Sequence, residues 1–153
     1  MKIASLQLEW YFISDLHLTA NKEFDQAKAA EIKYENLTVD VACTADKDEN
    51  RKWQVTLRVK HQGSADTNSP YSFSLELIGF MRVLKTYPDE QVERLVRTNG
   101  PSMLFGVARE ALRDLTARGP HVTVFLPSVS FYESTNSATA ATCSPVAASA
   151  SAQ

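Results

Sequence analysis

The sequence predicts an α+β domain in which a four-stranded antiparallel sheet is followed by a short and a long helix. Three observations support this prediction. Apolar and polar residues alternate in the first half of the chain, apolar residues recur at helical spacing in the second half, and the two patterns occupy separate blocks. With 153 residues, of which 44% are hydrophobic and 22% charged, the chain is long enough to bury one core.

The first expected strand begins at Leu6. Period-two alternation divides its residues between two faces: Leu6, Leu8, Trp10, Phe12, Leu16 and Leu18 on one, and Gln7, Glu9, Asp15 and His17 on the other. Residues 37–43 and 53–59 alternate in the same way and are joined by the polar stretch ADKDEN, which is typical of a hairpin connection. The fourth run begins at Tyr71 and becomes apolar on both faces beyond Leu77.

Two helices should follow the strands. The short one begins at Pro88 and ends at Asn99-Gly100, and the long one runs from Pro101 to Gly119. An apolar stripe on the long helix should pack on the sheet: Leu104, Phe105, Ala108, Ala111, Leu112 and Leu115. Residues 122–133 read as an extended segment that Pro127 interrupts.

The composition changes after residue 133. Ala, Ser and Thr make up 15 of residues 134–153 and none of these residues is charged, so they cannot bury enough apolar surface to offset the entropy of ordering. We therefore expect a folded domain over residues 1–133 and a disordered tail over residues 134–153.

Charge and cysteine usage limit the classes of partner. A formal net charge of −2 indicates no basic stripe that could bind a phosphate backbone. This argues against nucleic acid as a partner. We expect no signal peptide and no membrane insertion, because the N-terminal apolar stretch is interrupted by Gln7 and Glu9 and no apolar run approaches the length of a membrane span. Cys43 and Cys143 lie far apart and form no disulfide framework, which favours a reducing cytoplasm.

An alternative hypothesis starts from Asp15 and His17. An Asp-x-His pair at the end of a strand is how many calcineurin-like metallophosphoesterases begin a two-metal site, and on a strand both side chains point to one face. The chain lacks the Gly-Asp and Gly-Asn motifs that should follow, and His61 and His121 lie in the wrong contexts. We therefore expect no enzyme activity, no metal and no cofactor.

We expect more large apolar side chains than one sheet and one helix can cover. We expect this surplus to bind partners, either identical subunits or other chains: Trp10, Phe12, Trp53, Tyr71, Phe73, Phe80, Met81, Met103 and Phe105.

The stretch from Gly100 to Phe131 resembles the SecB family of export chaperones. That family carries a Pro-x-x-Leu-Phe-x-x-Ala-Arg-Glu helix, an Arg-Gly stop and a Pro-x-Val-x-Phe segment. The matching positions are Pro101, Leu104, Phe105, Ala108, Arg109, Glu110, Arg118, Gly119, Pro127, Val129 and Phe131. The resemblance extends more weakly over residues 3–133.

The resemblance implies a cytoplasmic chaperone that acts without ATP and assembles as a dimer of dimers. Such a chaperone holds unfolded polypeptides in apolar grooves, here built from the surplus apolar residues, and delivers secretory precursors to SecA. In the family, acidic residues on the outer sheet face contact SecA, and Asp15 and Glu76 match them.

Some positions depart from the family pattern. Thr19 replaces a common acidic residue, Ser74 replaces an apolar one, and the Ala/Ser tail replaces a C-terminal helix. One branch of the family serves toxin–antitoxin systems by protecting an antitoxin, and this function is the alternative to export.

Overall fold

The computed structural model describes residues 3–31 and 33–132, so the tail expected over residues 134–153 lies outside the described residues. The regular elements are the strands β1 (Leu6–Ala20), β2 (Leu37–Ala45), β3 (Lys52–His61) and β4 (Tyr71–Val83) and the helix α1 (Val92–Thr116). Three short 3₁₀ turns lie between them, at Gln26–Glu31, Ala65–Thr67 and Asp89–Gln91.

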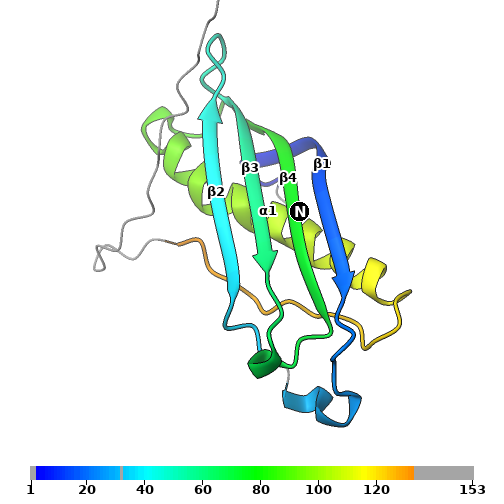
Figure 1. Cartoon of the computed structure of the whole chain (residues 1–153). Coiled ribbons are helices and arrows are strands. Elements are labelled where there is room, and N and C mark those ends of the chain that lie inside the picture. Colours follow the sequence, from blue (N-terminus) through cyan, green and yellow to red (C-terminus); the bar gives the residue numbers. More distant parts are fainter. Residues whose placement is uncertain (1–2, 32, 133–153) are drawn as a thin grey trace, which may run out of the picture.

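The four strands form one antiparallel sheet in the order β1-β4-β3-β2 (Figure 1), which confirms the predicted sheet. β2 and β3 form the expected hairpin, and β1 joins the sheet beside β4. β1 and β2 are therefore the two edges of the sheet.

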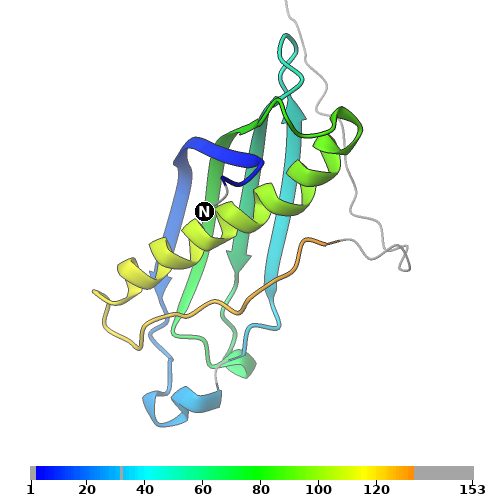
Figure 2. The same cartoon turned by 180° about the vertical axis from the view of Figure 1, so that it is seen from behind.

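α1 crosses one face of the sheet diagonally (Figure 2), and this helix-facing side holds the core. Alternate residues of the central strands point into it: Trp53, Val55, Leu57 and Val59 of β3, and Tyr71, Phe73, Leu75, Leu77, Met81 and Val83 of β4. From α1, the buried side chains of Leu104, Phe105, Ala108 and Leu112 meet them, as the apolar stripe predicted. No helix or strand of the described residues covers the opposite side of the sheet, here called the outer face.

The expected break between two helices is absent, because α1 runs through Gly100 and Pro101. Gly100 lets the helix approach the sheet closely, since a Cβ there would lie 2.9 Å from the Met81 sulfur. Pro101 removes one helical hydrogen bond, and the Ser102 hydroxyl donates to the Thr98 carbonyl at 2.9 Å in the same turn. Close packing against the sheet thus outweighs the local tendency of Gly-Pro to end a helix.

After α1 the chain turns back as an extended segment without strand pairing. Residues 121–132, here called the strap, run alongside α1 over the helix-facing side of the sheet (Figure 2). Val124 and Leu126 of the strap are buried in the core, and Val129 and Phe131 pack against its border.

β1 contains two irregularities, between Leu8 and Trp10 and between Ile13 and Asp15. Each bulge adds one residue and reverses the faces of the residues that follow. Leu6, Leu8, Leu16 and Leu18 lie opposite helix-facing residues of β4, whereas Trp10 pairs with Phe80 and Phe12 with Ile78 on the outer face. The prediction that Trp10 and Phe12 share a face with the leucines is therefore wrong.

In the described part of the chain, no helix is both long and apolar enough to cross a membrane.

Candidate functional site

The nine side chains expected on a binding surface fall into two groups. Five of them lie in the core between the sheet and α1: Trp53, Tyr71, Phe73 and Met81, which the alternation of β3 and β4 turns towards the helix, and Phe105 of α1 itself. Trp10, Phe12 and Met103 are exposed, and Phe80 is partly exposed. In this protomer only the second group can contact a partner directly.

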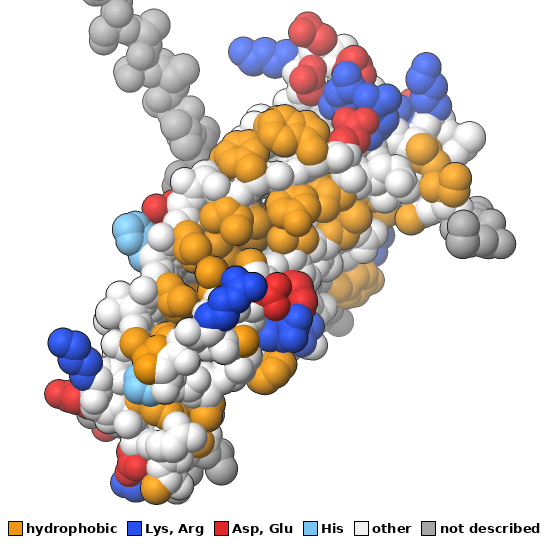
Figure 3. Space-filling view, turned by 90° about the vertical axis from the view of Figure 1, so that its right-hand side faces the viewer, with side chains coloured by type: hydrophobic (Ala, Val, Ile, Leu, Met, Phe, Trp, Pro, Cys, Tyr) orange, Lys and Arg blue, Asp and Glu red, His pale blue; other side chains and the backbone are white. Residues whose placement is uncertain are grey.

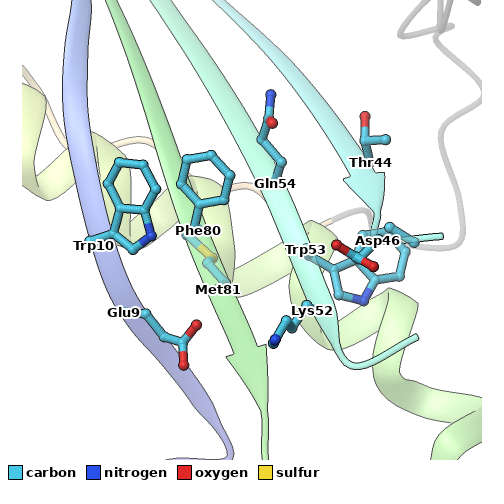
Figure 4. Close-up of a pocket in the computed structure, with 10 residues that line it drawn as sticks. Glu9, Trp10, Thr44, Asp46, Lys52, Trp53, Gln54, Phe80 and Met81 are labelled. Carbon is cyan, nitrogen blue, oxygen red and sulfur yellow. The ribbon is translucent and has the colours of Figure 1, made fainter. Parts of the chain in front are cut away.

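Three of these four side chains form an aromatic cluster on the outer face: Trp10 and Phe12 from β1 and Phe80 from β4. Trp10 and Phe80 are neighbours on the sheet (Figure 4), and their rings stack with centroids 4.2 Å apart and an interplanar angle of 8°. Phe12 continues the stack, 5.6 Å from Trp10. Because Trp10 remains 53% exposed, the cluster presents a flat apolar surface to solvent.

A hollow of about 300 Å³ adjoins this cluster (Figure 4), with an aromatic border at Trp10 and Phe80 and polar groups from β2 and β3. Thr44, Lys52 and Gln54 line its polar side. The Asp46 carboxylate accepts hydrogen bonds from the backbone N–H groups of Asp48 and Glu49, which hold the pKa of Asp46 below its usual value. This carboxylate therefore stays charged and fixed in its turn.

Paired charges border the cluster. The Glu76 carboxylate accepts a hydrogen bond from the Ser14 hydroxyl at 2.6 Å and pairs with Arg58, and these contacts lower its pKa. Asp15 lies opposite Glu76 in the β1–β4 register and contacts His17 at 3.1 Å. The structure thus brings together the two predicted SecA-contact carboxylates, but each already has a partner within the chain.

Asp15 and His17 do share a face, as the metal hypothesis required. Within residues 3–31 and 33–132, however, no group of three or more His, Cys, Asp or Glu side chains could hold a metal ion. The pair is an exposed surface contact.

The β1 edge carries apolar side chains that the sequence analysis did not single out. Tyr11, Ile13 and Leu16 lie opposite helix-facing residues of β4, yet all three are exposed. Figure 3, which views this edge, shows hydrophobic side chains gathered over it. The unbroken apolar run Trp10–Ile13 was the available signal, because a strand with one polar face would have interrupted it.

Comparisons with known proteins agree with one another. The family model described as preprotein translocase subunit SecB matches residues 2–139. The proteins named protein-export protein SecB from two strains of Acidithiobacillus ferrooxidans are 27% identical over 132 residues, which cover 84% of this chain and 85% of each relative.

A solved structure shares the fold. It is a SecB-like chaperone of Mycobacterium tuberculosis in complex with a ChAD peptide from the HigA1 antitoxin. The likeness has a TM-score of 0.58 at 18% sequence identity and covers 82% of this chain and 91% of that one.

Proposed function

Because this chain belongs to the SecB family, whose members are chaperones and not enzymes, we propose that it holds unfolded polypeptides and prevents their aggregation in the cytoplasm without ATP. The observation that carries the proposal is the exposed aromatic cluster of Trp10, Phe12 and Phe80 on an uncovered sheet face. Flat apolar contact is non-directional, so it suits many client sequences. Met103, exposed on α1, is a further candidate contact.

Self-association would use the open edge of β1 and the apolar side chains on its helix-facing side. Tyr11, Ile13 and Leu16 form an apolar margin beside an open strand edge, and an unpaired edge with such a margin favours pairing with a second chain. We propose that β1 edges join two protomers and that two such dimers form the tetramer. This arrangement leaves the outer-face cluster of each protomer open to clients.

Protein export is the process that the named relatives favour, with SecA as the receiving partner and Asp15 and Glu76 as its contact. One observation favours the second candidate, a chaperone dedicated to an antitoxin. Glu76 is already paired with Arg58, so that an acidic surface for SecA is partly neutralised, and Asp15 is already in contact with His17. Binding of SecA and of an antitoxin segment, measured side by side, separates the two.

Light scattering tests the chaperone function. A denatured, aggregation-prone protein is diluted into buffer with and without stoichiometric amounts of this chain and no ATP, and we expect the scattering to be suppressed. Replacing Trp10 and Phe12 together by Ser should raise the amount of chaperone needed by about fivefold or more, because exposed aromatic anchors dominate such contacts.

The matched control is Phe125→Ala, which removes an exposed aromatic side chain away from the cluster. Suppression that is unchanged in the Trp10/Phe12 variant would exclude the cluster as the client site. Wild-type protein that is folded but leaves the scattering unchanged would exclude general chaperone activity.

A further inference from the structure

The strap is held on the molecule in the way a bound peptide is held. Within the described residues, no backbone–backbone hydrogen bond joins residues 121–132 to the sheet or to α1. Its contacts are apolar side chains and a few hydrogen bonds to side chains. Such a segment can leave without breaking a strand ladder.

The first half of the strap is firmly fixed. The Val124 backbone N–H donates to the Thr116 hydroxyl at 3.0 Å, and the His121 N–H donates to the Tyr71 hydroxyl at 3.2 Å. Val124 and Leu126 are almost completely buried in the core. This half belongs to the permanent structure of the domain.

The second half is held less tightly. Val129 and Phe131 are only partly buried, and the Phe131 ring meets Phe105 edge-on with centroids 6.0 Å apart. Tyr132 is 59% exposed and is held by Arg94, which donates to its hydroxyl at 3.2 Å and lies 5.9 Å from the ring centroid. Exposed contacts of this kind contribute little individually.

We propose that residues 129–132 are a built-in occupant of a second client site, and that an extended apolar segment of an unfolded client displaces them and places an aromatic side chain against Phe105. The inference rests on the chaperone function proposed above. The strap itself indicates the client chemistry, since it alternates inward apolar side chains with outward ones: Val124 and Leu126 point in, whereas Phe125 is 66% exposed.

This arrangement gives Phe105 a binding role although it is buried in the free protomer. Phe105 is 4% exposed, and the partly exposed Phe131 is one of the side chains that cover it. With the strap closed, the free chaperone does not expose this ring to other chains. A client must then compete with residues 129–132. Its apparent affinity is its intrinsic affinity multiplied by the fraction of molecules in which the site is open.

The test measures binding of a dye-labelled, reduced and carboxymethylated protein, which stays unfolded in buffer, by fluorescence anisotropy. Phe131→Ala removes the occupant side chain and should tighten binding by about tenfold, because the site then spends more time open. Tyr132→Ala removes only the exposed attachment to Arg94 and should tighten binding by about threefold. The matched control, Phe125→Ala, removes an exposed aromatic of the same strap and should leave the affinity within about twofold.

Tyr132→Ala decides the question if Phe131→Ala does not fold, because Tyr132 is exposed and its removal leaves no cavity. Tighter binding by either folded variant supports the proposal. Binding by a variant also supports it if the wild-type protein binds no client. Equal or weaker binding by both, with a wild type that does bind, overturns this inference and leaves the chaperone function standing. If neither wild type nor variants bind, both proposals fail.

Discussion

The hydrogen bonds around His61 determine its tautomer. The Ser69 hydroxyl donates to the Tyr71 carbonyl at 2.9 Å, so the Ser69 oxygen must accept from His61 Nε2, which lies 2.8 Å away. The proton of the neutral ring is therefore on Nε2. Nδ1 is buried without a hydrogen-bond partner in the described structure, and the Tyr34 and Phe73 rings contact the imidazole.

This environment predicts a pH-dependent stability. Burial lowers the pKa of His61 from its ordinary value of 6.5, because a second proton on Nδ1 would create a buried charge. Between that value and the lower folded-state pKa the unfolded chain binds more protons than the folded chain. The free energy of unfolding should then fall as the pH drops below about 6.5, by at most about 1.4 kcal/mol per pH unit.

Urea unfolding followed at pH values from 7.5 to 5, chosen to span the usual His range, measures this slope. His61→Gln keeps an amide donor for Ser69 and should flatten the slope, whereas His17→Gln, a surface change, should leave it intact. A slope that is the same in His61→Gln as in wild type would show that other groups cause it.

Among the elements, the β2–β3 turn is tied to the start of α1 by one side chain. Arg51 donates to the Leu84 carbonyl at 2.6 Å and to the Tyr87 carbonyl at 2.8 Å, and it forms an ion pair with Asp89. These three groups lie on the connection between β4 and α1. Arg51 therefore fixes where the helix begins relative to the sheet.

Removing this link should be costly. Arg51→Met keeps the aliphatic stem but leaves two carbonyls without their charged donor, so we expect a loss of about 2–3 kcal/mol in the free energy of unfolding. The control, Arg113→Met, removes exposed pairs with Glu110 and Asp114, which solvent screens, and should lower the stability much less than Arg51→Met. Equal urea midpoints for the two variants would contradict this assignment.

The elements also show how far sequence reasoning extends. Alternation identified all four strands, and the helical stripe identified the face of α1 that packs on the sheet. The continuity of α1 through Gly100 and Pro101 could not be predicted, because it depends on contact with Met81, which is distant in sequence. The bulges of β1 likewise arise from pairing with β4 and leave no local signature.

The sequence predicted only part of the candidate site, again because contacts between distant elements decide which side chains are exposed. Trp10, Phe12 and Phe80 were expected to bind partners, and they do form one exposed surface. The sequence could not distinguish them from Trp53 or Met81, since the distinction depends on which face of the sheet α1 covers. Tyr11 and Ile13 were missed because strict alternation assigned them to a polar face.

At the scale of the whole molecule, the two sheet edges provide a matched test of assembly. Ile13 on β1 and Val41 on β2 both lie on the helix-facing side, with exposures of 42% and 40%. If β1 edges join protomers, Ile13→Asp should place two carboxylates at the interface and shift the assembly towards single chains, whereas Val41→Asp should not.

Sedimentation velocity at micromolar concentration measures the masses of these variants. Dissociation caused by Val41→Asp alone would move the proposed interface to the opposite edge. A wild type that sediments as a single chain would remove the proposal of a tetramer.

The different positions of the two tryptophans give this protein a pair of intrinsic optical reporters. Trp10 is 53% exposed in the outer-face cluster, and Trp53 is 9% exposed in the core, with its indole N–H donating to the Asn50 carbonyl at 3.1 Å. A small neutral quencher therefore reaches the emission of Trp10 first. Fluorescence from an unlabelled sample can distinguish occupancy of the outer face from unfolding of the core, because the first shields Trp10 and the second exposes Trp53.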